Sequence, residues 1–185
     1  RLKKNKEKLR IAFDGFSASG KSLGAKLIAK KYNLKLLNSG LLYRYAAFLI
    51  LKKKPKNKIF FLKKKFSKLN YKQLNTINLH SEKISAYSSI IAKHKNVRLI
   101  LKKYQKKFAK KFSRIAIEGR DISTKILNKN PKYDIAFFFK CNLNTAGYRR
   151  WIDLKRSNKQ ITVSEVKKSL KKRNELDVKR RFSPL

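Results

Sequence analysis

The 185-residue sequence predicts an α/β domain in which helices cover both faces of a doubly wound parallel sheet. Short apolar runs of strand length alternate along the chain with longer segments whose apolar residues recur at helical spacing. Hydrophobic residues make up 42% of the chain, which is enough to bury a core, and the length suits a single domain over residues 1–185.

The first part of the chain contains two predicted strands, each followed by a helix. An apolar run that ends at Asp14-Gly15 predicts the first strand. The helix after it carries Leu23, Leu27 and Ile28 on one face and lysines on the other. In order, the predictions are a strand at 9–13, a helix at 22–32, a strand at 34–37 and a buried helix at 41–51.

Residues 52–80 differ in composition from the segments around them. They combine lysine clusters with Pro55 and the apolar run at 59–61, and they predict a small inserted lobe of undefined structure. Helical periodicity returns after this segment and predicts helices at 81–93 and 96–111.

The last part of the chain is predicted to contain two strands and two helices. The second of these strands is wholly apolar, as expected when both faces of a strand are covered, so its phenylalanines are predicted to lie in the core. A capping-box pattern marks the start of the last helix. The elements are a strand at 114–117, a strand at 135–139 with Phe137, Phe138 and Phe139, a helix capped by Asn142 or Asn144 that runs through Trp151, and a helix that begins at Thr162 with Glu165 and runs toward Arg173.

The chain is strongly basic, with 51 Lys+Arg against 10 Asp+Glu and a formal net charge of +41. The lysines are spread along the whole chain, so they predict a solvated basic surface with weak, salt-dependent attraction to polyanions. No apolar run approaches the ~18 residues of a membrane helix, so no membrane association is expected. Cys141 stands alone, which excludes an internal disulfide and fits a reducing, cytoplasmic compartment. His80 and His94 are predicted to be surface side chains.

Residues 15–22, Gly-Phe-Ser-Ala-Ser-Gly-Lys-Ser, fit the phosphate-loop (P-loop) pattern G-x-x-x-x-G-K-[ST]. Glycines let the backbone curl so that successive amides point at phosphate oxygens, and the following helix adds the positive end of its dipole. Lys21 is expected to reach the β- and γ-phosphates, and the Ser22 hydroxyl is expected to bind Mg²⁺. The loop lies between a predicted strand and a predicted helix, which is the context that such a loop requires.

Further polar residues follow two other predicted strands. Ser39 precedes Arg44 by about one helical turn, and Arg120 and Asp121 come directly after the strand at 114–117. The carboxyl ends of parallel strands face one crevice, so these side chains should meet the phosphate loop there. A pocket with several arginines beyond the loop indicates a second anionic substrate, as in a phosphotransferase.

On these residues the chain resembles the bacterial cytidylate kinase family, P-loop kinases of the nucleoside-monophosphate type, from residue 11 to residue 185. The resemblance rests on the phosphate loop, on Ser39-Gly40 with Tyr43-Arg44, and on the run Glu118-Gly119-Arg120-Asp121. It implies a monomeric enzyme that transfers the γ-phosphoryl group of ATP to CMP or dCMP with Mg²⁺ as cofactor. It also implies a short mobile lid at about 149–161.

The resemblance further implies a role for each matching residue. The expected ATP-binding residues are Gly15, Ser17, Ala18, Ser19, Gly20, Lys21, Ser22 and Leu23, with Arg149 and Arg150 of the lid. The expected CMP-binding residues are Ser39, Arg44, Arg120 and Arg180 around the phosphate, Ser89, Arg98 and Asp121 at the cytosine, Asp177 at the sugar, and Tyr43. The expected catalytic residues are Lys21, Arg120, Arg173 and Arg180.

The sequence departs from the family pattern at several places. Asn38 stands where the family usually has Asp, and Ala146 stands where the lid usually begins with Arg. The insertion is shorter than usual, and family members continue for about one strand and one helix beyond Leu185, so a truncated chain is expected. Two alternatives stay open from the residues alone: a basic nucleic-acid-binding P-loop NTPase, or a small P-loop kinase with another acceptor such as UMP.

Overall fold

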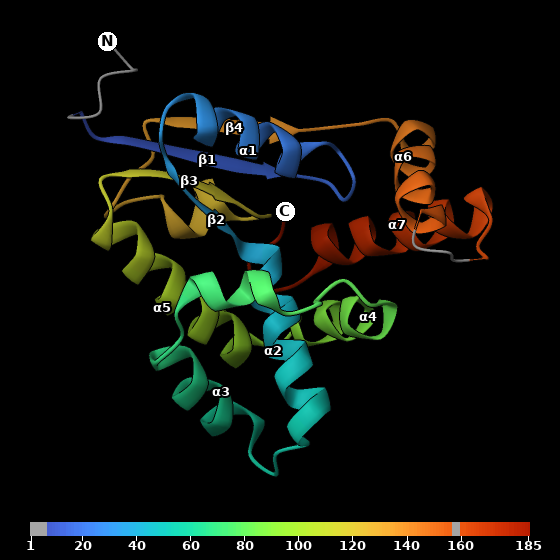
Figure 1. Ribbon diagram of the computed structural model, residues 1–185, viewed down its shortest axis with the longest axis horizontal. Helices are drawn as coiled ribbons and strands as arrows, with labels where there is room; N and C mark the ends of the chain where they lie inside the picture. The colour runs from blue at the N-terminus through green and yellow to red at the C-terminus, as the bar shows by residue number, and fades with distance from the viewer. Residues whose placement is uncertain (1–6, 157–159) are drawn as a thin grey trace.

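The computed structural model describes residues 7–156 and 160–185, which form a parallel sheet with helices on both of its faces (Figure 1). The strands are β1 (Leu9–Gly15), β2 (Lys35–Asn38), β3 (Arg114–Glu118) and β4 (Ile135–Phe139), in the order β2-β3-β1-β4. Every neighbouring pair is parallel. The predicted doubly wound α/β class is confirmed, and all four carboxyl ends lie at one edge of the sheet.

The two faces of the sheet bury two separate apolar clusters. On one face, Ile11 and Phe13 of β1 pack with Ala25 and Ala29 of α1 (Lys21–Lys31). On the other face, Ala12 belongs to the larger cluster that contains α2 (Ser39–Lys53) and α5 (Lys95–Lys111). Successive side chains of β1 point to opposite faces of the sheet, so this strand contributes to both apolar clusters.

The segment predicted as an inserted lobe contains two helices, α3 (Lys58–Ser67) and the 3₁₀ helix η1 (Tyr71–Thr76). Leu62, Phe66, Leu74 and Leu79 are buried in the same cluster as α2 and α5. Helix α4 (Glu82–Ile91) follows and packs against α2. The segment therefore shares its apolar contacts with the helical layer below the sheet (Figure 1).

Helices α6 (Leu143–Lys155) and α7 (Val163–Lys179) pack against each other at the side of the sheet (Figure 1). Asn142 caps α6, and the capping box of Thr162 and Glu165 begins α7 as predicted. The range expected for the lid, about 149–161, includes the end of α6. Residues 157–159 of this range lie outside the described part of the chain. No helix among the described residues is long and apolar enough to cross a membrane.

Two predictions of burial are wrong. Strand β4 is an edge strand, and Phe137 and Phe138 are 39% and 50% exposed, while Phe139 is half-buried against α1. On α1, Leu23 and Leu27 are exposed, and the smaller Ala25 and Ala29 face the sheet instead. The small residues allow close approach: a Cβ on Gly24 would lie 2.8 Å from the Phe139 ring.

Gly15, the last residue of β1, is required by its surroundings. It has a φ of 144°, and a Cβ there would lie 2.2 Å from the Phe139 carbonyl oxygen. Glycine therefore permits β4 to pair with β1 up to the point where the chain turns into the phosphate loop.

Candidate functional site

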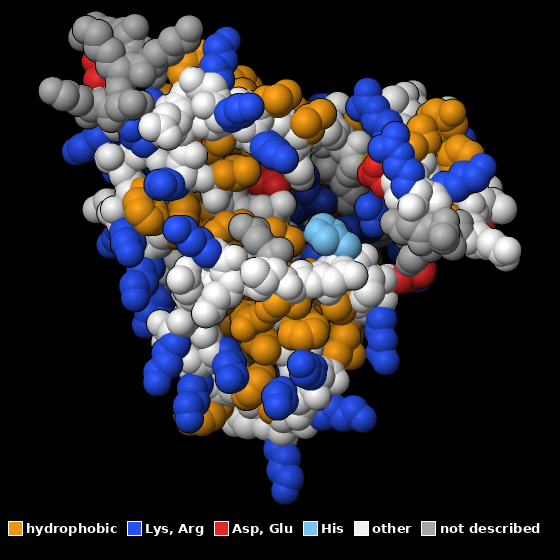
Figure 2. All heavy atoms as spheres, viewed as in Figure 1, with side chains coloured by type: hydrophobic (Ala, Val, Ile, Leu, Met, Phe, Trp, Pro, Cys, Tyr) orange, Lys and Arg blue, Asp and Glu red, His pale blue; other side chains and the backbone are white. Residues whose placement is uncertain are grey.

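A cavity of about 640 Å³ opens at the carboxyl ends of the strands, between the sheet and the α6–α7 pair. Figure 2 shows this side of the molecule hollowed, with lysine or arginine side chains deep in the hollow. Of the residues predicted for the site, Gly15 alone is not in the cavity wall, because it lies behind the loop against β4. The predicted residues in the wall are Ser17, Ala18, Ser19, Gly20, Lys21, Ser22, Leu23, Ser39, Tyr43, Arg44, Ser89, Arg98, Arg120, Asp121, Arg149, Arg150, Arg173, Asp177 and Arg180.

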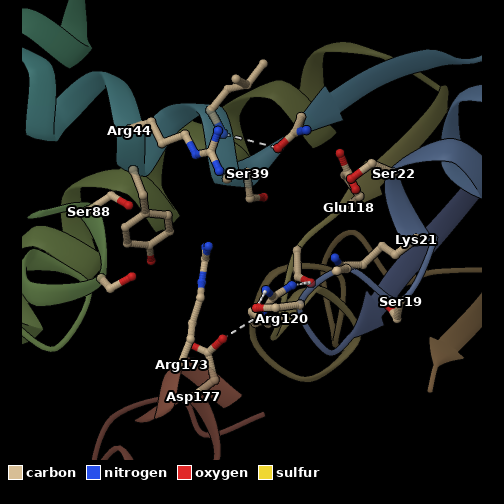
Figure 3. Close-up of a pocket in the computed structure, with 18 of the residues that line it drawn as sticks. Ser19, Lys21, Ser22, Ser39, Arg44, Ser88, Glu118, Arg120, Arg173 and Asp177 are labelled. Carbon is tan, nitrogen blue, oxygen red and sulfur yellow. Dashed lines mark hydrogen bonds and ion pairs between the residues drawn. The ribbon is translucent and has the colours of Figure 1, made fainter. Parts of the chain in front are cut away.

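The phosphate loop connects β1 to the first turn of α1 and faces the cavity (Figure 3). Its curvature places Ala18 and Gly20 at positive φ, and the Ser19 hydroxyl donates to the Phe16 carbonyl oxygen at 2.9 Å. Lys21 is buried, and burial together with the charge of Arg120 lowers its pKa to about 7. The positive charge of Lys21 is poorly solvated and lies near other cations, so it would bind the phosphates of a nucleotide strongly.

Ser22 and Glu118 are the residues that could hold Mg²⁺. Figure 3 shows both near Lys21, with Ser22 on α1 and Glu118 at the end of β3. Glu118 is 3% exposed, and its carboxylate makes no hydrogen bond or ion pair with any described residue. A hydroxyl and one carboxylate, completed by phosphate oxygens and water, fit the oxygen ligands that Mg²⁺ prefers. Sequence reasoning gave Glu118 no role, although the residue directly follows the strand predicted at 114–117.

One wall of the cavity holds a buried ion pair. Arg98 of α5 donates to Asp121 at 2.6 Å, and its guanidinium lies 5.5 Å from the ring centroid of Tyr43. Burial raises the pKa of Tyr43, so its hydroxyl remains protonated and can donate. Ser88 and Ser89 of α4 both line this wall, and Ser88 is the more buried of the two. The wall therefore presents donors and one carboxylate acceptor at fixed positions.

Arginines also gather around Asp177 of α7, close to this ion pair. Arg120 donates to Asp177 through Nε at 2.7 Å, and Arg180 donates to it at 2.9 Å. Arg120 also donates to the Ser17 hydroxyl at 2.8 Å, so it joins the phosphate loop to α7. Burial and the charge of Arg120 lower the pKa of Arg173 to about 10, and Figure 3 shows its guanidinium directed into the cavity.

The two arginines predicted for the lid lie on different sides of the cavity. A Cβ on Gly20 would be 3.9 Å from a guanidinium nitrogen of Arg149, which places Arg149 beside the phosphate loop. Arg150 instead lies near Arg44. Burial is the main cause that lowers the pKa of Arg44, and the positive charge of Arg150 is the next. Arg44 and Ser39 both belong to α2, and the Ser39 hydroxyl donates to Gln105 at 2.6 Å.

Two further residues were missed by sequence reasoning. Asp14, at the end of β1, accepts hydrogen bonds from the amides of Ile122 and Ser123 at 2.7 and 2.8 Å. These bonds hold the loop that carries Arg120 and Asp121 against β1. His80 is exposed, as predicted, but its place at the rim of the cavity beside Arg44 was not predicted. His80 belongs to no recognisable motif, whereas Asp14 lies in the family-like run at 11–15 directly before the phosphate loop.

A strand, a phosphate loop and a helix that open on a cavity with a second cationic subsite define a P-loop phosphotransferase. The cytidylate kinase family model matches residues 11–185, and the chain belongs to the cytidylate kinase family.

Relatives agree with this assignment, and a solved structure has a similar fold. The chain is 34% identical over 180 residues to the cytidylate kinase of Bartonella tribocorum, covering 95% of this chain and 80% of the relative. It is 32% identical over 190 residues to the cytidylate kinase of Mycoplasmopsis synoviae, covering 96% and 86%. The fold is similar to that of an uncharacterized protein from Eubacterium ventriosum, with a TM-score of 0.53 at 17% identity, covering 96% of this chain and 80% of that one.

Proposed function

We propose that this protein transfers the γ-phosphoryl group of ATP to the phosphate of CMP or dCMP, giving ADP and CDP or dCDP. The observation that carries the proposal is that one cavity contains both the phosphate loop with Lys21 and the buried Arg98–Asp121 pair. The family match supports a cytidine nucleotide as the acceptor and does not favour the nucleic-acid-binding or UMP alternatives.

In this reaction an oxygen of the acceptor phosphate attacks the γ-phosphorus in line. The new P–O bond forms as the bond to the β-phosphate oxygen breaks, and ADP leaves. Lys21 and Arg173 would balance the charge that spreads over the transferred group, while Arg120 would hold the acceptor oxygen beside the loop. Ser22 and Glu118 would hold Mg²⁺, which supplies further charge neutralisation on the phosphates.

The buried ion pair supports a cytosine acceptor. Asp121 can accept a hydrogen bond from the exocyclic amino group of cytosine, and Arg98 can donate to the ring acceptors. Uracil presents a carbonyl oxygen where cytosine presents the amine, so it would face the Asp121 carboxylate acceptor to acceptor. An unpaired buried polar group costs about 1–3 kcal/mol, so the pair would favour cytosine by about tenfold or more.

The remaining assignments follow from the same cavity. Ser39, Arg44, Arg120 and Arg180 would bind the acceptor phosphate, Asp177 the sugar, and Ser88 or Ser89 the base edge. Arg149 would contact the ATP phosphates, and Arg150 would act nearer the acceptor. Closure of the end of α6 over ATP would exclude water and suppress hydrolysis. The proposed active form is a monomer.

A coupled assay of ADP release against CMP, dCMP, UMP and AMP tests the proposal. Turnover with CMP and dCMP well above that with UMP and AMP is the expected result. Equal turnover with UMP would overturn the cytosine assignment. ATP hydrolysis that RNA stimulates without any nucleotide acceptor would instead favour the nucleic-acid-binding alternative.

A further inference from the structure

His80 lies at the rim of the cavity, next to the arginine assigned to the acceptor phosphate. An Arg44 guanidinium nitrogen and His80 Nδ1 are 2.5 Å apart, and both side chains line the cavity. The two residues are far apart in the chain, Arg44 on α2 and His80 directly before α4. The contact therefore joins the end of the 52–80 segment to the acceptor side of the cavity.

The backbone around His80 is held in place from both sides. Leu79 is fully buried in the main core. The His80 amide donates to Asn78 Oδ1 at 3.1 Å, and Ser81 caps α4 through the amide of Ile84. The imidazole is therefore presented to Arg44 by a fixed segment of chain.

The contact determines the protonation of His80. Arginine has only donors, so Nδ1 must accept, and the ring proton must be on Nε2. Burial lowers the pKa of His80, and the charges of Arg44 on α2 and Arg150 on α6 lower it further. These effects keep the imidazole neutral near neutral pH.

Arg44 differs from the other arginines around the acceptor side in the kind of partner it has. Arg98 is paired with Asp121, and Arg120 and Arg180 are paired with Asp177. Among the described residues, His80 is the only hydrogen-bond partner of the Arg44 guanidinium. A carboxylate would compete with an incoming phosphate for the charge of Arg44, whereas a neutral imidazole orients the guanidinium without neutralising it.

We propose that His80 is a positioning residue for the acceptor phosphate: its neutral imidazole fixes the Arg44 guanidinium and leaves the charge of that guanidinium free for the phosphate of a nucleoside monophosphate. This inference rests on the proposed function, in which Arg44 binds that phosphate.

Three substitutions at one position separate this role from a purely structural one. In His80→Ala the Nδ1 atom that accepts a hydrogen bond from Arg44 is lost. The KM for CMP is expected to rise about fivefold to tenfold while the KM for ATP stays within twofold. In His80→Asn an amide oxygen can replace Nδ1, so most of the lost affinity is expected to return. In His80→Asp a carboxylate would bind Arg44 more tightly but compete with the phosphate, so the KM for CMP should rise at least as far as in His80→Ala. His94→Ala, at the start of α5, is the matched control.

Nuclear magnetic resonance of the free protein gives a readout that is independent of turnover. The chain has two histidines, so a His94→Gln variant assigns both imidazoles. His80 is expected to be the Nε2–H tautomer with a pKa below the ordinary value of histidine, and Arg44→Gln is expected to raise that pKa. A doubly protonated His80 at neutral pH, or an unchanged KM for CMP in His80→Ala, would overturn the inference. Absence of CMP turnover in the unmodified protein would count against the proposed function, and the imidazole spectra would still report on the Arg44 contact.

Discussion

The Arg98 guanidinium and the Asp121 carboxylate lie 2.6 Å apart in the cavity wall, with side chains only 8% and 12% exposed. Removing either partner of such a pair leaves an uncompensated charge in a poorly solvated place, which costs about 3–5 kcal/mol. The same two groups offer the acceptor and the donor that a cytosine edge requires. The pair is therefore both a structural and a recognition element.

Asp121→Asn should weaken the preference for cytosine. The amide preserves the shape of the side chain but replaces one acceptor by a donor, so the ratio of kcat/KM for CMP over UMP is expected to fall about tenfold. The KM for ATP should remain near its original value. Asp134→Asn, whose carboxylate accepts from the Arg10 amide near the other end of the sheet, is the matched control. An unaltered CMP-to-UMP ratio in Asp121→Asn would remove Asp121 from base recognition.

Lys21→Met should abolish most turnover without preventing CMP binding. Loss of one well-placed donor to the transition state lowers kcat by about 10²–10³-fold. Steady-state kinetics and calorimetric titration with CMP measure the two effects separately. Loss of CMP binding together with kcat would mean that Lys21 supports the whole cavity rather than the transferred phosphate.

The same lysine predicts how folding stability depends on pH. Its pKa is about 7 in the folded protein and 10.5 when unperturbed. Between these values the unfolded chain binds more protons than the folded one, so the contribution of Lys21 to the free energy of unfolding rises with pH across this window. Lys21→Met removes the penalty, so its melting temperature should exceed that of the unmodified protein below about pH 7. Thermal unfolding followed by circular dichroism checks this, and a lower melting temperature there would contradict it.

Binding of ATP should take up a proton at Lys21. Phosphate oxygens favour the charged amine, so the pKa of about 7 in the free protein rises on binding. Proton uptake per ATP is expected to approach one at about pH 8 and to decline toward about pH 6. Titration calorimetry in buffers of different ionisation enthalpy gives the number of protons. The uptake should disappear in Lys21→Met, and equal uptake in both proteins would assign it to another group.

Two glycines of the phosphate loop should respond differently to alanine. Gly15→Ala adds a methyl group 2.2 Å from the Phe139 carbonyl oxygen at a φ of 144°, so both collision and backbone strain destabilise the fold. In Gly20→Ala the added methyl group makes only an ordinary contact with Arg149, 3.9 Å away, so the φ of 87° sets the cost at about 1–2 kcal/mol. Urea unfolding should show a larger loss in the free energy of unfolding for Gly15→Ala than for Gly20→Ala. Equal losses would mean that β4 can shift away from the added methyl group at little cost.

Local chemical signals were sufficient to predict much of the fold. The phosphate loop, the positions of the four strands and the capping box of Thr162 and Glu165 each depend on neighbours in sequence, and the structure contains them. Burial was harder to predict. The apolar run at 135–139 indicates a strand but does not say how many elements cover it, so the exposure of Phe137 and Phe138 could not be foreseen.

Residues that act through distant contacts were the least predictable. A lone His80 in a lysine-rich chain has no motif, and its contact with Arg44 arises only when α2 and α4 pack together. Similarly, Asp14 acquires its role from Ile122 and Ser123, which lie more than one hundred positions away. The location of Glu118 was easier to anticipate, because it directly follows a predicted strand and the carboxyl ends of parallel strands face one crevice.

The crowding of cations in the cavity has a consequence for the stability of the protein in a cell. Lys21, Arg44 and Arg173 each have a pKa lowered by burial and by other positive groups, so they repel one another until an anion arrives. Nucleotides bind there to the folded protein and not to the unfolded chain, so they raise the free energy of unfolding. Starvation for nucleotides would then expose the polypeptide to proteases, and abundant supply would protect it.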